Sequence, residues 1–303
     1  MMNYDPHRWT DHLFDIQGSM VREILGRVSL TVLWAVAITT LYELAGNEFR
    51  GHVYVPEYVH NIAIPETCHV LVGGAMGLLL VFRTNSSYDR FWEGRKLWGG
   101  IVNETRNLVR LTTTLLAEEP QTVREIVLWT IAFPWSAMSR LRGVKEYGPI
   151  FDELPPDVVK EIFDAEHVPL AIARRITFLL DEARQRGSID SYQMGMLDQN
   201  VQLLIDYLGG CERIRATPLP YAYTVHLRRA LVFFFFTLPF ALMPRFGWDT
   251  PLAVLLTSYV FFGIEEIGVE IEDPFGEDEN DLPLATICAS IEVTLRDVIK
   301  ERK

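Results

Sequence analysis

The sequence predicts an all-α protein that lies partly in a membrane and partly in water. Three observations carry this prediction: four long apolar runs, helical periodicity in the polar stretch between the second run and the third, and an intermediate hydrophobic content. Hydrophobic residues make up 49% of the 303 residues, and the mean hydropathy is +0.11. That is too apolar for an average soluble protein and too polar for one that lies almost wholly in a bilayer.

Charge and cysteine usage exclude several classes of protein. The net charge is -12, whereas a nucleic-acid-binding protein is expected to carry a basic face. Cys68, Cys211 and Cys288 are far apart and lack metal-ligand spacing, so we expect small buried residues and no disulfide framework. No nucleophile–histidine motif, phosphate loop or zinc spacing is present, so an enzyme is not expected.

The first membrane span is expected over residues 28–46. This run carries one charge, Glu43, and is long enough to cross a hydrocarbon core. The segment before it is polar and aromatic. Its apolar residues recur at helical spacing, which predicts an amphipathic helix at the membrane interface: Trp9, Leu13, Ile16, Met20 and Ile24.

The second span is expected over residues 65–83. Its short apolar run contains Gly73, Gly74 and Gly77, and such small residues let helices approach closely inside a membrane bundle. His69 would be costly against lipid, which places this helix inside a bundle or against water. No proline separates the run from the helical pattern that follows, so one helix is expected to leave the bilayer and continue into water.

The polar stretch, residues 84–217, is predicted to be a water-facing helical region. After the helix that continues to Leu116, further helices are expected, the last two of them amphipathic and joined by a turn at Gly187: Thr122–Arg140, Pro156–Ala165, Leu170–Arg186 and Ser191–Arg215.

Two more spans are expected over residues 228–246 and 251–269, followed by an acidic segment and a final amphipathic helix in residues 270–303. An even number of crossings puts both termini on one side. The arginines that flank the runs gather on that side, so the positive-inside rule places the termini and the helical middle in the cytoplasm: Arg22, Arg27, Arg83, Arg228 and Arg229.

Four stretches, in order along the chain, resemble the bacterial branch of the bestrophin family. They are GGAMGLLLVFR (73–83), FRTNSSYDRFWEGRKLWG (82–99), TPLPYAYTVHLRR (217–229) and IEDPFGEDENDLPL (271–284). The resemblance implies a homopentamer of four-span subunits around one central pore. The second span would line that pore, and the expected location is the bacterial inner membrane.

The resemblance also implies two constrictions. Aligned on Arg83, the neck of the pore falls at Thr67, Leu71 and Ala75, which share one helix face. Thr67 is polar and Ala75 is small, so Leu71 is the one large apolar ring. Another register, with Val70 and Gly74 facing the pore, stays open.

A second constriction, the cytoplasmic aperture, is expected at Leu219 with Thr217 beside it. At the outer end of the second span, His69 has two interpretations: it lines the pore mouth, or it makes a structural hydrogen bond.

The acidic segment resembles the stretch that holds calcium in animal bestrophins, with Asp273, Asp278 and Asp281 at the ligand positions. The alternative is a solvated acidic turn, and the pattern of an EF-hand is absent. We expect that no cofactor is required.

The function implied by the resemblance is passive conduction of monovalent ions, with chloride or another anion as the leading assignment. Sodium or another monovalent cation is the alternative. A membrane scaffold or sensor, binding a cytoplasmic partner through the amphipathic helices between Leu170 and Arg215, is a third hypothesis of a different class. The expected partners are the lipid bilayer, further copies of the chain and the permeant ions.

Overall fold

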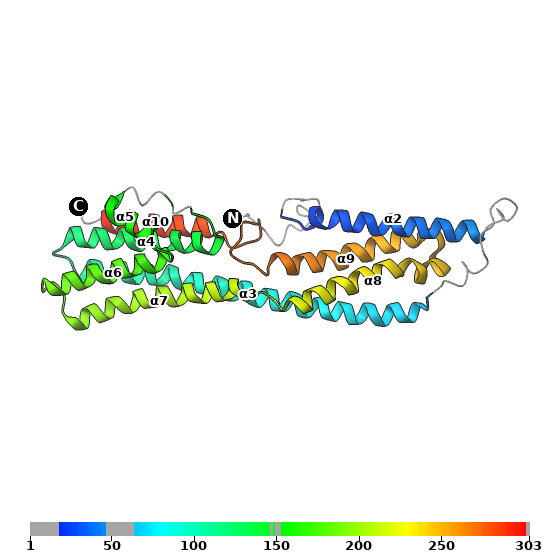
Figure 1. Ribbon diagram of the computed structural model, residues 1–303, viewed down its shortest axis with the longest axis horizontal. Coiled ribbons are helices and arrows are strands. Elements are labelled where there is room, and N and C mark those ends of the chain that lie inside the picture. The colour runs from blue at the N-terminus through cyan, green and yellow to red at the C-terminus, as the bar shows by residue number, and fades with distance from the viewer. Residues whose placement is uncertain (1–17, 47–63, 146–147, 149–152, 301–303) are drawn as a thin grey trace. The chain divides into compact units, whose positions relative to one another are not determined.

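The computed structural model describes residues 18–46, 64–145, 148 and 153–300, and within these ranges it is helical with no strand. The helices are α2 (Val21–Gly46), α3 (Glu66–Leu115), α4 (Pro120–Arg142), α5 (Pro156–Phe163), α6 (Val168–Gln185), α7 (Ser191–Ala216), α8 (Tyr221–Phe246), α9 (Thr250–Glu270) and α10 (Leu284–Lys300), with a short 3-10 helix, η4 (Gly247–Asp249), between α8 and α9 (Figure 1).

These residues form two compact units. One unit, the polar-surface unit, contains Arg90–Thr217 and residues 273–300. The other, the apolar-surface unit, contains residues 18–89 and Pro218–Glu272. The helix α3 contributes its first part to the apolar-surface unit and the rest to the polar-surface unit, so the predicted unbroken passage from apolar run to polar helix is confirmed.

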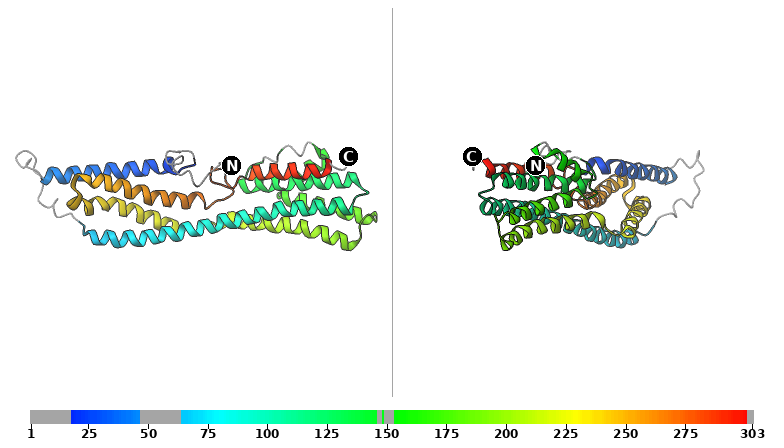
Figure 2. Two further views of the ribbon diagram at one scale, coloured as in Figure 1. Left: turned by 180° about the vertical axis from the view of Figure 1, so that it is seen from behind. Right: turned by 60° about the vertical axis from the view of Figure 1, so that its left-hand side comes forward.

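The polar-surface unit is built around α4. This helix is apolar on most of its faces and packs against α6, α7 and α10, which lie beside it in Figure 2. Its central side chains, such as Trp129, Ile131 and Phe133, are completely buried. A helix that is buried on every side forms the core of its bundle.

The connection between α6 and α7 follows from local sequence. Gly187 adopts a left-handed φ of 82°, which a glycine accepts without strain. The Asp190 side chain accepts a hydrogen bond from the backbone N–H of Gln193, and the Gln193 side chain accepts one from that of Asp190. This capping box begins α7 one residue later, so the predicted pair of helices around Gly187 is confirmed.

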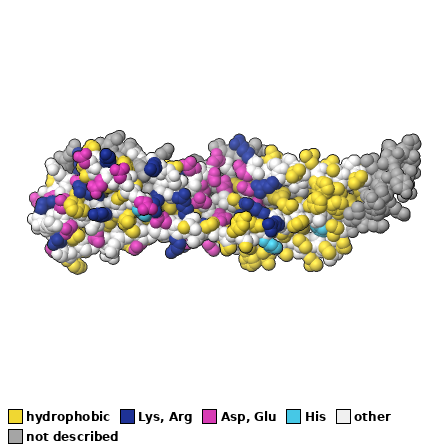
Figure 3. Space-filling model, viewed as in Figure 1, with side chains coloured by type: hydrophobic (Ala, Val, Ile, Leu, Met, Phe, Trp, Pro, Cys, Tyr) yellow, Lys and Arg dark blue, Asp and Glu magenta, His cyan; other side chains and the backbone are white. Residues whose placement is uncertain are grey.

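The apolar-surface unit consists of α2, the first part of α3, α8 and α9. Its core is small and rich in phenylalanine: the rings of Phe234 and Phe261 stack with centroids 5.7 Å apart. On the outside, Trp34 stacks on Phe236 and donates a hydrogen bond from Nε1 to the Phe236 carbonyl, which joins α2 to α8. Figure 3 shows hydrophobic side chains spread widely over the exposed surface of this unit.

Among the described residues, three stretches are long and apolar enough to cross a membrane: Val21–Glu43, Glu66–Leu115 and Tyr221–Glu270. The third stretch contains both α8 and α9, so each of the four predicted apolar runs lies in a helix of its own. The number of crossings stays a prediction.

The bounds of the predicted spans stay predictions, but two of the helices that contain them begin seven residues earlier than the spans at 28 and 228. α2 begins at Val21 and α8 at Tyr221, because their polar first turns continue the same helix as the apolar run. Residues 21–27 therefore belong to α2 and not to a separate interfacial helix, and the rest of that prediction, residues 1–17, lies outside the described residues.

Candidate functional site: an exposed helix face beside a buried ion cluster

The first half of α3 has a packed face and an exposed face. Met76, Leu80 and Arg83 are almost completely buried, and they recur every three or four residues, so they form one stripe along the helix. Gly73 lies on the same stripe, where a Cβ atom would come within 3.4 Å of the Phe234 ring. The most deeply buried contacts with α8 and α9 therefore lie along this stripe.

The predicted neck residues lie on the exposed side. Leu71 is 70% exposed, and Thr67 and Ala75 are exposed as well. With 3.6 residues per turn, Leu71 points almost directly away from the packed stripe. The other register is exposed too, because Val70 is 66% exposed and Gly74 has no atom within 4 Å of a Cβ position. Both registers thus stay open in the single chain.

His69 lies toward the packed side of α3. Its Nε2 atom is 3.0 Å from the hydroxyl oxygen of Thr237 on α8, and its ring lies 5.6 Å from that of Phe234. These contacts match the structural hydrogen-bonding role that was one of the two interpretations of this residue.

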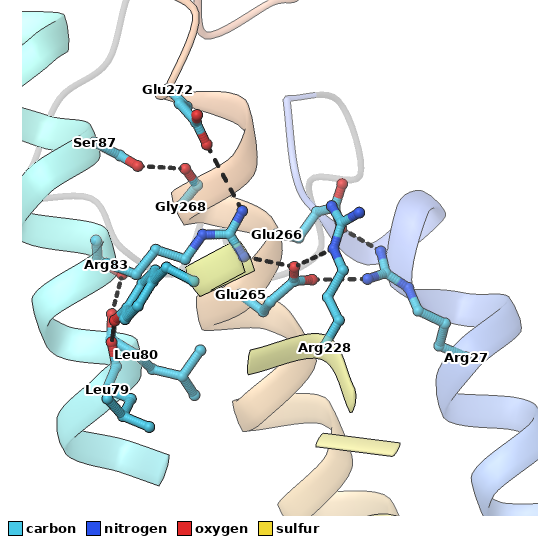
Figure 4. Close-up of polar contacts among 12 residues, drawn as sticks. Arg27, Leu79, Leu80, Arg83, Ser87, Arg228, Glu265, Glu266, Gly268 and Glu272 are labelled. Atoms are coloured by element: carbon cyan, nitrogen blue, oxygen red, sulfur yellow. Dashed lines mark hydrogen bonds and ion pairs between the residues drawn. The ribbon is translucent and has the colours of Figure 1, made fainter. Parts of the chain in front are cut away.

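A buried carboxylate, Glu265 on α9, organises one end of the apolar-surface unit. Its side chain is 1% exposed and contacts three arginines from three other helices (Figure 4). Arg83 of α3 donates to it at 2.7 Å, Arg27 of α2 at 2.9 Å and Arg228 of α8 at 3.3 Å. One acid thereby links all four helices of the unit.

The arginines around Glu265 have further acidic partners. Arg27 also pairs with Glu266, and the second terminal nitrogen of Arg83 lies 3.8 Å from Glu272. The cluster thus holds three arginines and three glutamates, Arg27, Arg83, Arg228, Glu265, Glu266 and Glu272, and carries no net formal charge. Neutralisation of this kind is required for ionised groups to be retained in a buried position.

The predicted aperture residues are held through their backbones. The N–H of Leu219 donates a hydrogen bond of 2.9 Å to Glu272, whose other oxygen faces Arg83. The carbonyl of Thr217 accepts from Arg90, which also donates to the Ile214 carbonyl at 2.7 Å and so caps the end of α7.

The acidic segment is an internally bonded turn. Asp281 accepts a hydrogen bond of 2.8 Å from the backbone N–H of Asp278, and Asp273 accepts one of 3.3 Å from that of Phe275. A Cβ at Gly276 would lie 2.5 Å from the Asp281 carboxylate, so a larger residue there would have to displace this side chain. Phe275 is buried and anchors the turn. In the described part of the chain, no group of three His, Cys, Asp or Glu side chains could hold a metal ion.

Cys211 and Cys288 are buried and lack nucleophilic character. Burial raises the pKa of Cys211 and of Cys288 to about 12, so both thiols stay protonated at neutral pH. The prediction that all three are buried was wrong for Cys68, which is exposed on α3. The reason is that Cys68 lies away from the stripe that packs against α8 and α9.

Sequence reasoning missed the central role of Glu265. Glu265 lies within the predicted fourth span, residues 251–269, but no partner was predicted for it. A signal was available, since an acid inside an apolar run must be paired when it is buried. Its three partners come from distant parts of the sequence, so only the folded chain identifies them.

The sequence matches a family described as bacterial/fungal bestrophin protein over residues 1–297. A protein of Synechocystis sp. named as a voltage-dependent anion channel-forming protein is 36% identical over 97% of this chain and 93% of its own length. A protein of Nostoc sp. with the same designation is 37% identical over 96% of this chain and 91% of its own length.

The fold gives the same result. The crystal structure of a bacterial bestrophin homologue from Klebsiella pneumoniae has a TM-score of 0.82 and 32% sequence identity to this chain, covering 91% of this chain and 98% of that one. The four motifs of the sequence, the arrangement of the helices and these relatives agree over nearly the whole length: the chain belongs to the bacterial/fungal bestrophin family.

Proposed function

We propose that this chain is one subunit of a membrane channel that conducts monovalent ions passively, with anions, chloride among them, as the permeant species. The observation that carries the proposal is the exposed face of α3. It includes Thr67, Leu71 and Ala75, lies in a stretch apolar enough to cross a membrane, and has no packing partner among the described residues of the chain.

Several copies of the chain would complete the pathway. If five subunits place this face toward a common axis, Leu71 forms a ring of apolar side chains, and such a ring gates a pore by controlling its wetting. Thr67 and Ala75 would form weaker barriers on either side, because one is polar and the other small. The backbone-held segment at Thr217 and Leu219 is the proposed cytoplasmic aperture.

The choice of anions over sodium rests on the relatives, which are named as anion channel-forming proteins. The ion cluster around Glu265 does not decide the matter, because its three arginines balance its three glutamates. The overall charge of -12 favours cations weakly. Sodium conduction is therefore the alternative outcome of the experiment below.

The proposed orientation places the cytoplasm at the Glu265 end of the apolar-surface unit. Arg22, Arg27, Arg228 and Arg229 lie in the parts of α2 and α8 nearest this cluster, whereas Arg245 alone lies toward the other end of α8. The inner membrane of a bacterium is the proposed location. We further propose that conduction needs no calcium, so chelation with EDTA should leave the currents unchanged.

A planar bilayer with asymmetric sodium chloride tests the function. The purified protein should give currents whose reversal potential lies near the chloride equilibrium potential. A reversal potential near that of sodium would establish the cation alternative, and a silent bilayer would favour a scaffold or sensor. Native mass spectrometry tests the subunit number, and any value other than five would contradict the pentamer.

A further inference from the structure

We propose that Arg228 and Arg229, with His226 one turn before Arg229, form a binding site for the phosphate group of an anionic phospholipid at the surface of the apolar-surface unit. The inference rests on the membrane placement proposed above. It adds a specific lipid and the residues that bind it. All three side chains are exposed and lie on α8, about two turns from the segment Pro218–Pro220.

Arg228 keeps hydrogen-bond donors that are not used within the described part of the chain. Its side chain is 56% exposed, and only its Nε atom reaches Glu265, at 3.3 Å. Its two terminal nitrogens have no partner among the described residues. A guanidinium that keeps two terminal N–H groups free can donate two parallel hydrogen bonds to a phosphate.

The acids around this arginine are already engaged. Glu265 accepts from Arg83 and Arg27 at shorter distances than from Arg228, and Glu266 pairs with Arg27. The cluster as a whole has no net formal charge, but no acid in it engages the terminal nitrogens of Arg228. Arg229 and His226 make no hydrogen bond or ion pair with any other described residue, so the exposed side of this segment offers charge that an anion can complement.

The surface next to these cations is suited to hydrocarbon. One turn along α8, Val232 is 64% exposed and Phe233 is 68% exposed, and Phe236, a further turn on, is 52% exposed. Residues three and four apart share a helix face, so Arg229 stands at the end of this apolar stripe. Figure 3 shows Lys and Arg side chains gathered at the edge of the hydrophobic surface.

This arrangement favours a lipid over a free anion. A free phosphate or chloride ion uses only the cations and gains nothing from the adjoining apolar stripe. A phospholipid uses both, because its phosphate meets the arginines while its acyl chains cover Val232, Phe233 and Phe236.

The test measures lipid retention. Wild-type protein in detergent is incubated with phosphatidylglycerol or phosphatidylcholine, and the lipid-bound fraction is read by native mass spectrometry. Wild type should bind phosphatidylglycerol preferentially. The variant R228Q/R229Q should lose about 30-fold in affinity for it, at about fivefold for each basic side chain near an anionic surface.

The matched control is R245Q. Arg245 is also on α8 and is 71% exposed, but its terminal nitrogen lies 3.3 Å from the carboxylate of Glu66. This variant should retain wild-type lipid binding. The charge-conserving R228K/R229K should keep most of it. The single variant R229Q keeps the test decisive if the double variant fails to fold, because Arg229 contacts no described partner, and it should lose about fivefold.

Equal retention of phosphatidylglycerol by wild type and R229Q would overturn the proposal. So would equal binding of the two lipids by the wild type. An R229Q variant that binds lipid normally but has an altered ion permeability ratio would show that these arginines meet permeant ions instead. Lipid retention is read without any current, so a silent bilayer contradicts the proposed function and leaves this inference standing.

Discussion

The two units of this chain distribute polar and apolar side chains in opposite ways. In the polar-surface unit, the largest buried side chains are aromatic, such as Trp98, Trp129 and Phe133. In the apolar-surface unit, Arg83 is among the largest completely buried side chains, while Leu71 and Phe233 are 70% and 68% exposed.

Under the proposed membrane placement, this difference matches the solvent that each unit would meet. In water, burial of apolar surface drives helices together. In a bilayer, apolar side chains gain nothing by leaving the lipid, so helices associate through close packing and polar contacts. The Glu265 cluster is such a polar contact. It links the four helices of the apolar-surface unit, whereas in the polar-surface unit the buried helix α4 packs against the helices around it.

The largest effect is expected from E265Q. The substitution leaves Arg83 buried without its closest charged partner, which should cost about 3–5 kcal/mol of folding free energy and reduce the yield of assembled protein. Thermal unfolding followed by size-exclusion fluorescence measures it. The control is E66Q, because Glu66 is 46% exposed and its ion pair with Arg245 lies in solvent. If E265Q is as stable as E66Q, the buried cluster does not hold the apolar-surface unit together.

The second prediction compares the loss of stability when one apolar side chain is truncated in each unit. Ile131 is completely buried in α4, so I131A should cost about 2–5 kcal/mol through the cavity it leaves. Leu30 is 71% exposed in α2, so L30A should change stability by no more than about 0.5 kcal/mol. Thermal unfolding in the same detergent compares the two. Similar losses would contradict the idea that the two units bury their apolar residues differently.

L71A should have a smaller effect on folding than these variants, but it should also change conduction. Because Leu71 is exposed in the single chain, the truncation should leave folding nearly unchanged and raise single-channel conductance or open probability. V70A is the matched variant for the other register. An increase with V70A but not with L71A would move the neck to Val70 and Gly74.

The smallest effect concerns Glu119 in the polar-surface unit. Arg186, with Ser188 and Thr122, holds the pKa of this carboxyl at about 2, against an ordinary 4.5. A lowered pKa stabilises the fold above pH 4.5, and this contribution is lost as the pH falls through 2. E119Q should therefore cost about 1 kcal/mol at neutral pH, as partly exposed pairs do, and remove part of the acid sensitivity.

The control for that variant is E118Q, whose side chain is exposed and makes no ion pair with another described residue. Stability is measured by thermal unfolding from pH 7 to pH 2. The same pH profile for E119Q and wild type would show that the Glu119 pair does not contribute.

The sequence by itself determined the class of the fold, the helices and the family. Local features sufficed for this: apolar runs of membrane length, the Gly187 turn, and motifs such as TPLPYAYTVHLRR. It also placed Leu71 on a helix face that the structure leaves exposed, because the spacing of residues on a helix is a property of the chain alone.

The tertiary structure alone decided which charges meet. Glu265 is buried with Arg83, while Arg228 touches the same acid weakly and keeps its terminal nitrogens free. Arg83 and Arg228 are the same type of residue, and their side chains differ only in what surrounds them. The strength of an ion pair depends on burial and distance, and these arise when helices distant in the sequence pack together.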